Sequence, residues 1–556
     1  MAQTEIRKKI AELMQAVDFS EKETVLPWHL EMLNLLETLV SELTKLQEEN
    51  QQLRDENNKL KGEQGKPKVR KQSKEKEDIS SEEERKRGQS KKKKKSKKKK
   101  NKIIIDRVEI CDVDKSQLPD DAKFQGYQSV IVQDIIIKTD NVEFKKKTYY
   151  SPSLKKTFMA DLPEGYDGEF GPNTKALVLD LHYASKMTER AILTFLRNHR
   201  ISISAATISR FITDDHDEFH QEKKDIVQSG LASSIHQQMD DTSARVNGIN
   251  HYTHILCNDL YTAYFTRRHK NRLTIIDILT QGDVLFHFNE STYALMEQMH
   301  LPNKQLVRLR EEIKKNRLNR GQADEMLKVL FPDPNKNITN RNIILEASAI
   351  IAYQQLPHAI EILLADDAPQ FKQITNLLGL CWIHDGRHYK KLKPVVPLHQ
   401  KKLKEFLSDY WDYYHKLLDY KKRPTVPLAQ SLEKEFDALF SIITGYDQLD
   451  ERIKRTKLKK DSLLLVLKHP SLPLHNNTSE LGARSQARYR DISFHTINEK
   501  GTQSKDTFMT LVETAKKLAV NSYHYFYDRI SKKHEMPSLA NLIKSNTLDS
   551  SHLDSG

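Results

Sequence analysis

The stretch Ser233–Arg267, SSIHQQMDDTSARVNGINHYTHILCNDLYTAYFTR, decides the fold class. Its β-branched and aromatic residues cluster between turn-forming residues, which predicts strands at Ser233–Asp240, His251–Cys257 and Tyr261–Arg267. The first predicted strand ends in the acidic pair Asp240-Asp241. Helical periodicity returns on both sides of the stretch, so the sequence indicates an α/β protein.

A second acidic pair follows another predicted strand. The buried apolar run Ile360–Ala365 leads into Asp366-Asp367, and a third acid, Glu480, lies in a predicted helix opened by the polar run 475–478. Three carboxylates from separate elements suit hard divalent cations, and two such ions can assist phosphodiester chemistry. Aspartate is also an ordinary turn residue at strand ends, and the chain has 77 acidic residues, so spacing alone does not establish a metal site.

The composition restricts the class of protein. The chain has 556 residues, 30% charged and 37% hydrophobic, which predicts more than one domain. No apolar run approaches the roughly 18 residues of a membrane span, and the charged segment Met1–Leu13 is unlike a signal peptide. The three cysteines, Cys111, Cys257 and Cys381, cannot form a disulfide framework. We therefore expect a cytoplasmic protein without a membrane partner.

The positive charge is concentrated in one segment. The net charge is +13, and residues 66–102 hold 19 Lys+Arg and 6 Asp+Glu, so they account for all of it. The low-complexity tract 62–102 has very few apolar residues and its positive charges repel one another, which predicts a disordered basic linker. It could be a solvated linker only, or an arm that releases counterions from nucleic acid.

The N-terminal segment 1–61 is expected to be helical with a coiled coil over 30–61. Leucines repeat every seven residues, which makes an apolar seam that a partner helix can bury. Asparagine at heptad position a favours a parallel dimer. The alternative is a single helix that folds back on its own domain. The heptad places Leu39, Leu46, Leu53 and Leu60 at d and Leu36, Leu43, Asn50 and Asn57 at a.

Two modules are predicted between the linker and the first acidic strand. Residues 103–172 alternate over Ile103–Val108 and Ser129–Thr139, which predicts a small β-rich module. Residues 173–215 read as three helices, the last of them N-capped by Ser204. Helix, short turn and capped helix outline a helix-turn-helix that contacts DNA, although helical hairpins that only pack are more common.

Four blocks in order resemble the insertion-sequence-66-type transposase family. The resemblance covers about 173–530, and the family also tends to begin with a leucine-rich helical segment and a basic linker. The blocks are Asp240-Asp241-Thr242 with Arg245-Val246-Asn247-Gly248; Leu364-Ala365-Asp366-Asp367-Ala368-Pro369-Gln370-Phe371; Cys381-Trp382-Ile383-His384; and Leu474-His475-Asn476-Asn477-Thr478-Ser479-Glu480 with Arg484 and Arg490 beyond it.

The resemblance implies an RNase H-like Asp-Asp-Glu catalytic domain over 233–530, with a helical insertion at about 392–470 and a C-terminal tail at 531–556. Asp240 would lie on the first strand, Asp366 on the fourth and Glu480 on a later helix, together holding two Mg²⁺ ions, or Mn²⁺. The implied activity is cleavage of the ends of a mobile element in double-stranded DNA, followed by strand transfer. The implied setting is bacterial and nucleoid-associated, with possible accessory proteins encoded by the element.

Several positions depart from the family pattern. Asp241 stands where the family usually has Glu, which is a conservative change. His475 stands where Asp is usual, and Leu481 stands where Arg is common. The zinc-ribbon cysteines of the family are absent from 103–170. The long separation of Asp240 and Asp366 implies a further helical insertion near 291–345. An inactive copy that acts as a DNA-binding regulator is the alternative function, and an RNase H-like nuclease without strand transfer is a third.

The residues next to the three predicted metal ligands can each be interpreted in two ways. Asp241 and Asp367 are expected to lie outside the metal-binding set. Cys381 and His384 could bind a metal, but two ligands make no closed zinc site, so we expect Cys381 in the core and His384 beside the active site. Arg484 lies four residues after Glu480 on the same helical face, where it could contact phosphate or pair with Glu480.

Overall fold

The computed structural model describes most of the chain. The predicted basic linker, 62–102, lies outside the described residues, and so does most of the segment before the coiled coil. Among the helices that are described, none combines the length and apolarity needed to cross a bilayer. The described ranges are 27–60, 104–114, 122–313, 315–333 and 335–553.

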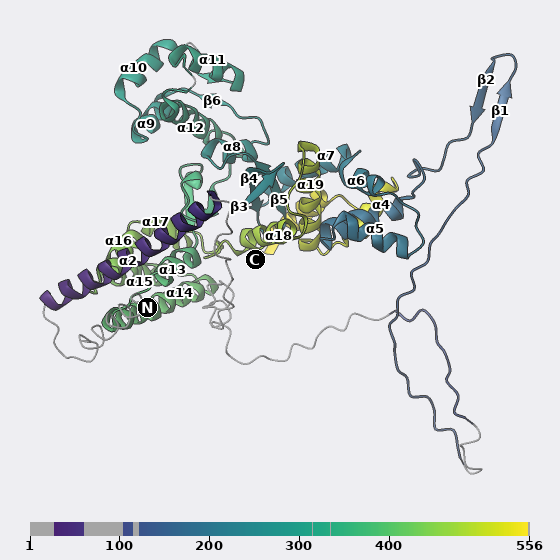
Figure 1. The fold of residues 1–556 in the computed structure, drawn as a ribbon, viewed down its shortest axis with the longest axis horizontal. Helices are drawn as coiled ribbons and strands as arrows, with labels where there is room; N and C mark the ends of the chain where they lie inside the picture. Colours follow the sequence, from purple (N-terminus) through teal and green to yellow (C-terminus); the bar gives the residue numbers. More distant parts are fainter. Residues whose placement is uncertain (1–26, 61–103, 115–121, 314, 334, 554–556) are drawn as a thin grey trace.

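A five-stranded mixed sheet forms the centre of the protein (Figure 1). The strand order is β5-β4-β3-β8-β9; β3, β4 and β5 pair antiparallel, whereas β8 pairs parallel with both β3 and β9. The structure therefore confirms the α/β class. The bounds are β3 His236–Val246, β4 Ile249–Cys257, β5 Thr262–Arg267, β8 Ile362–Ala365 and β9 Leu377–Leu380.

The strand prediction was right for β4 and β5 and wrong for the end of β3. Strand β3 does not stop at the acidic pair but continues to Val246, because its antiparallel pairing with β4 runs from Gln238 opposite Cys257 to Val246 opposite Ile249. Asn247 and Gly248 close this hairpin with φ values of 48° and 74°, the left-handed conformation that such a turn requires. Asp240 consequently lies in the middle of a strand.

Helices cover the sheet and one of its edges. Helix α18 lies over β3 and β4, and α19 runs along β5. Backbone N–H groups of the edge strand β5 donate to α19 side chains: Thr262 to Thr514 (3.2 Å), Tyr264 to Thr510 (3.1 Å) and Thr266 to Asp506 (2.5 Å). This satisfies polar groups that an open edge would expose. The bounds are α7 Asp217–Ala232, α18 Asn477–Ser493, α19 Glu499–Lys517 and α20 Ser522–Ile530.

The segment 531–556, predicted to be a tail, contains a packed helix instead. Helix α21, Leu539–Leu553, lies against α7 and buries Leu539, Ala540 and Ile543 in the main core. The backbone N–H of Leu539 donates to Glu222 of α7 at 3.2 Å, which joins the two helices at the start of α21.

Two helical insertions interrupt the sheet domain, close to the predicted positions. The first, between β5 and β8, carries a short antiparallel strand pair, β6 Phe286–His287 with β7 Arg317–Leu318, whose strands are separated by two helices. The second, between β9 and α18, has its own core, in which Trp382, Tyr410 and Phe436 are fully buried. The helices are α8 Arg272–Leu279, α9 Glu290–Gln298, α10 Asn303–Glu312, α11 Arg320–Leu330 and α12 Ile338–Gln354 in the first, and α13 Trp382–Lys390, α14 Pro397–Lys422, α15 Val426–Leu439, α16 Asp447–Lys457 and α17 Lys460–Leu463 in the second.

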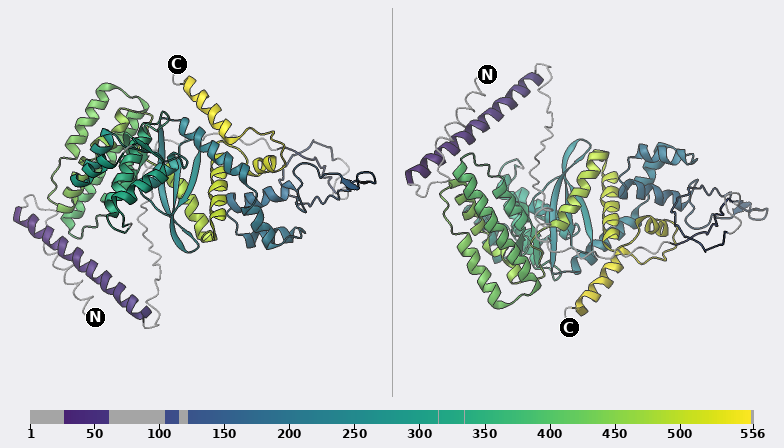
Figure 2. Two further views of the ribbon diagram at one scale, coloured as in Figure 1. Left: turned by 90° about the horizontal axis from the view of Figure 1, so that it is seen from above. Right: turned by 90° about the horizontal axis from the view of Figure 1, so that it is seen from below.

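The predicted coiled-coil segment is one long helix, α2 Pro27–Leu60, that lies across the second insertion (Figure 2). Leu33 packs against Val396 and Leu398, and Glu37 accepts hydrogen bonds from the backbone N–H groups that precede α14. This docking corresponds to the alternative that the helix folds back. The heptad leucines nevertheless remain 42–66% exposed, so pairing with a second copy stays a prediction; these are Leu39, Leu43, Leu46 and Leu53.

The region before the sheet differs from its prediction in part. Residues 104–114 and 122–147 form no strands, and only the hairpin β1 Thr148–Ser151 with β2 Lys156–Met159 is present in the described part of 103–172. The apolar side chains have no second layer to bury them, and Val130 and Ile136 are 80% and 86% exposed. Helices α4 Pro172–Leu179, α5 Glu189–Asn198 and α6 Ala205–Thr213 follow, and Ser204 caps α6 as predicted, accepting from the Thr207 N–H at 3.1 Å.

Candidate functional site

Parallel pairing of β3 and β8 brings the two aspartates together. Gln238 is paired with Leu364, and Asp366 directly follows the end of β8, where continuing this register leads to Asp240; the charge of Asp366 acts on Asp240. Neighbouring strands lie about 4.8 Å apart, and residues that share a register position point to the same face of the sheet. The separate acidic pairs of the sequence therefore supply two adjacent carboxylates at the centre of the sheet.

The surroundings of Asp240 oppose its ionisation. Burial is the largest cause, followed by the charge of Asp366, and Asp241 and Glu480 add to it; together they raise the pKa of Asp240 from 3.8 to about 7. A hydrogen bond from the Asp241 N–H at 2.8 Å partly offsets this. Burial also raises the pKa of Asp366, against a hydrogen bond from the Ala368 N–H at 3.1 Å. Converging, desolvated carboxylates are characteristic of cation and catalytic sites.

Helix α18 carries the third carboxylate over the same face. Gly482 lies against Ile255 of β4, where an added Cβ would meet the Ile255 side chain at 2.8 Å. Tyr264 of β5 donates its hydroxyl hydrogen to the Gly482 carbonyl oxygen at 3.1 Å. The absence of a side chain at Gly482 thus lets α18 approach the sheet closely, two residues after Glu480.

Two side chains of α13 contact Glu480. Arg387 Nη2 lies 3.2 Å from Glu480 Oε2, and His384 Nε2 lies 3.6 Å from Oε1. Burial lowers the pKa of His384, and the charge of Arg387 lowers it further, so this imidazole favours its neutral form. Arg484, for which a phosphate contact and pairing with Glu480 were both open, is half-buried one turn further along α18, and the ion pairs shown for Glu480 run to α13.

The second member of each acidic pair is engaged elsewhere. Asp241 accepts hydrogen bonds from Gln370 Nε2 at 2.6 Å and Lys270 Nζ at 3.3 Å. Asp367 pairs with Lys459 at 2.6 Å and Lys372 at 2.9 Å.

The pKa of Asp367 reflects these partners. Burial alone would raise it, but hydrogen bonds from Lys459 and Lys372 outweigh burial and hold the pKa of Asp367 below its usual 3.8. Asp367 is thus neutralised by lysines, while the charge of Asp241 still acts on Asp240 and Asp366, so the expectation that both lie outside the carboxylate set stays a prediction.

The donors at this site suit a hard divalent cation. Asp240, Asp366 and Glu480 offer carboxylate oxygens, the ligands that Mg²⁺ and Mn²⁺ prefer. Burial first, and the charges of the neighbouring carboxylates after it, raise the pKa of Asp240, and a bound cation would offset both effects. By donor chemistry these residues suit the predicted ions, while among the described residues the ligand atoms that lie within 4.8 Å of one another are those of Cys381, His384 and Glu480.

Sequence reasoning missed Arg387, Lys270 and Lys459. Arg387 follows His384 by three residues, which places both on one face of α13, so a signal for its contact with Glu480 was available. Lys270 and Lys459 reach the acidic pairs from separate elements, and neither belongs to a motif that would have indicated it.

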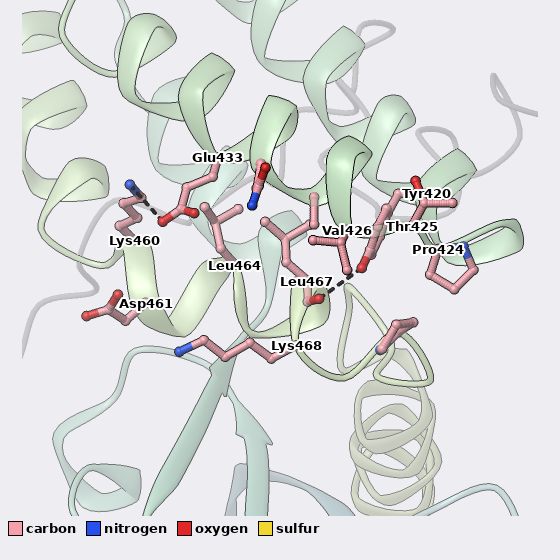
Figure 3. A pocket seen from close by; sticks show the side chains of 13 residues that line it. Tyr420, Pro424, Thr425, Val426, Glu433, Lys460, Asp461, Leu464, Leu467 and Lys468 are labelled. Atoms are coloured by element: carbon pink, nitrogen blue, oxygen red, sulfur yellow. Dashed lines mark hydrogen bonds and ion pairs between the residues drawn. The ribbon is translucent and has the colours of Figure 1, made fainter.

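A shallow cavity of about 470 Å³ lies elsewhere, between α14–α15 and the segment 460–470 (Figure 3). Glu433 pairs with Lys460 at 3.3 Å along one side, and Tyr420 donates to the Leu467 carbonyl oxygen at 2.9 Å on another. None of its lining residues belongs to the carboxylate set. Its mixed lining is typical of a groove between packed helices.

Comparisons with known proteins are sparse. No protein-family model matches the chain. The chain is similar to the uncharacterized protein y4jO of Sinorhizobium fredii (strain NBRC 101917 / NGR234), with 28% identity over 309 residues that cover 55% of this chain and 94% of that protein. That relative's name gives no activity, so the function has to be inferred from the motifs and the geometry of the site.

Proposed function

We propose that this chain is a DNA transposase of the Asp-Asp-Glu class, which cleaves the ends of its mobile element and joins them to target DNA. The observation that carries the proposal is the convergence of Asp240, Asp366 and Glu480 from a central strand, its parallel neighbour and a helix over the sheet. Three antiparallel strands followed by two parallel ones support an RNase H-like fold. The four motif blocks that resemble insertion-sequence-66-type transposases supply the substrate class.

The protein's own residues would organise the phosphodiester substrate. The three carboxylates would hold two Mg²⁺ or Mn²⁺ ions, which activate an attacking oxygen and stabilise a leaving one when bound. Arg387 keeps one oxygen of Glu480 paired and fixes the orientation of that carboxylate. Lys270, paired to Asp241 at the surface, places positive charge near the site, where the DNA backbone would pass.

DNA binding is assigned to other parts of the chain. The α5–α6 unit would enter a groove of the element end, and the basic tract 66–102 would contact phosphates without reading bases. The heptad leucines of α2 would pair two copies, so that both element ends are held together. This division predicts that binding and cleavage can be lost separately.

The test is a cleavage assay beside a binding assay. The substrate is a labelled duplex carrying the inverted repeat that flanks the coding sequence, incubated with the full chain and Mg²⁺ or Mn²⁺. Asp366→Asn should abolish cleavage and retain binding, whereas the adjacent Asp367→Asn should cleave much more than Asp366→Asn. Full cleavage by Asp366→Asn would refute the site, and binding without cleavage by the wild type would favour the DNA-binding regulator.

A further inference from the structure

A second set of ligand atoms meets at Glu480. Cys381 Sγ, a ring nitrogen of His384 and a carboxylate oxygen of Glu480 all lie within 4.8 Å of one another. Cys381 and His384 belong to the turn before α13 and to its first turn, while Glu480 comes from α18. Sulfur and imidazole nitrogen are softer donors than the oxygens of Asp240 and Asp366, so this set has a different metal preference.

Buried polar atoms without partners surround this set. His384 Nδ1 is buried and makes no hydrogen bond of acceptable geometry. Asn476 is fully buried, and neither its amide nitrogen nor its amide oxygen is satisfied. Its amide lies against His384 and raises the pKa of that imidazole against the effect of burial, but the two side chains do not reach hydrogen-bond geometry. An unsatisfied buried amide is unfavourable and needs a physical explanation, which a ligand would provide.

The position of Cys381 is compatible with a metal-bound thiolate. Burial raises the pKa of the Cys381 thiol to about 12, while backbone hydrogen bonds from Asn476 and His384 favour the thiolate. A metal ion displaces the thiol proton, which passes to solvent as the sulfur–metal bond forms. The charge of Arg387 opposes a cation here; Arg387 pairs with Oε2 of Glu480, and His384 lies on the Oε1 side.

We propose that Cys381, His384 and Glu480 bind one thiophilic divalent ion, Zn²⁺ in preference to Mg²⁺, with the Asn476 amide or water at the fourth position. Three protein ligands and one further position form a common tetrahedral zinc arrangement. The sequence provided only two of these ligands, and the fold adds the third. One consequence rests on the proposed function: Zn²⁺ in this site engages Glu480 and inhibits the Mg²⁺-dependent reaction.

Cobalt substitution tests the site without an activity measurement. The full chain carries Cys111→Ser, so that the exposed thiol does not contribute, and is titrated with Co²⁺. We expect a saturable, one-equivalent thiolate-to-cobalt absorption band that Zn²⁺ removes. Cys381→Ser should lose the band, and the matched control Cys257→Ser, also a fully buried cysteine, should keep it.

A histidine variant keeps the proposal testable if the cysteine variant misfolds. If Cys381→Ser melts below its parent, His384→Gln takes its place and should weaken binding at least about tenfold. Absence of saturable binding in the parent, or an unchanged band in Cys381→Ser, would overturn the proposal.

Activity then tests the consequence. Zn²⁺ should inhibit cleavage by the parent at concentrations that saturate the cobalt-sensitive site, and should inhibit a folded Cys381→Ser protein much less. Equal inhibition of both proteins would overturn the consequence. Failure of the parent to cleave under any condition would count against the proposed function but not against the metal site. The two outcomes are distinguishable because the cobalt band does not depend on cleavage.

Discussion

Replacing Asp240 by Asn should stabilise the metal-free protein while removing its activity. Burial and the neighbouring Asp366 carboxylate are the main causes that raise the pKa of Asp240 from 3.8 to about 7. The pKa of this carboxyl group is higher in the folded protein than in the unfolded chain, so the folded protein holds the proton more tightly. As pH rises and the group ionises, the folded state is therefore destabilised. The amide of Asn has nearly the same shape and no charge to bury, so the variant avoids this penalty.

The magnitude follows from the shift. One pKa unit corresponds to about 1.4 kcal/mol, so a rise from 3.8 to about 7 amounts to roughly 4 kcal/mol at pH 7. The penalty is absent below about pH 4, reaches roughly 2 kcal/mol at pH 5 and is complete above about pH 7. The stability difference between Asp240→Asn and wild type should therefore widen by about 2 kcal/mol from pH 5 to pH 7, which is several degrees in melting temperature.

Scanning calorimetry of the full chain in a chelating buffer measures the difference at both pH values. Added Mg²⁺ should raise the melting temperature of the wild type more than that of Asp240→Asn. Asp367→Asn is the matched control with the opposite sign: the pKa of Asp367 is lowered, so its charge stabilises the folded state above the unfolded pKa, and its loss should destabilise the protein at pH 7. A pH-independent difference for Asp240→Asn, or equal Mg²⁺ stabilisation of both proteins, would refute the reasoning.

Three further predictions concern other parts of the chain. Gly482→Ala should reduce cleavage strongly, because its Cβ would lie 2.8 Å from Ile255 and displace α18; Gly321→Ala, where the nearest atom lies at 3.6 Å, should be harmless in the same assay. Replacing the heptad leucines by Lys should lower the mass measured by light scattering, whereas Leu33→Ala should loosen the docked helix without changing that mass; a monomeric wild type would contradict this. Deleting Lys91–Lys100 should weaken DNA binding equally for all sequences and flatten its salt dependence, and an unchanged salt slope would identify the tract as a linker only.

Sequence patterns predicted the elements whose formation depends mainly on nearby residues. Strands β4 and β5, the capped helix α6 and the helical insertions follow from periodicity and turn residues. The end of β3 was misjudged because Thr242 and Ser243 are polar, and polar residues suit a half-exposed hairpin arm as well as a loop. The Asn247-Gly248 turn was the signal that the strand continues, since such turns join adjacent antiparallel strands directly.

Patterns that need a distant partner were predicted less well. Alternation over Ser129–Thr139 indicates a strand only if a second layer covers its apolar face, and the described residues provide none there. The contact of Arg387 with Glu480 joins residues 93 positions apart, and that of Lys459 with Asp367 depends on how the second insertion packs against the sheet. Sequence spacing gives no signal for the Lys459 contact, whereas the three-residue spacing of Arg387 from His384 is a local signal for the other.

The electrostatic surroundings distinguish residues that are neighbours in sequence and identical in chemistry. Asp366 and Asp367 are adjacent, yet the pKa of the first is raised, chiefly by burial, and that of the second is held down by two lysines. A carboxylate that lysines already neutralise gains little from a cation, whereas one buried among other carboxylates gains much. In the other pair, the Asp241 side chain accepts hydrogen bonds from Gln370 and Lys270. Asp240 and Asp366, which accept backbone hydrogen bonds and whose pKa values burial raises, are therefore the members that would gain most from a divalent ion.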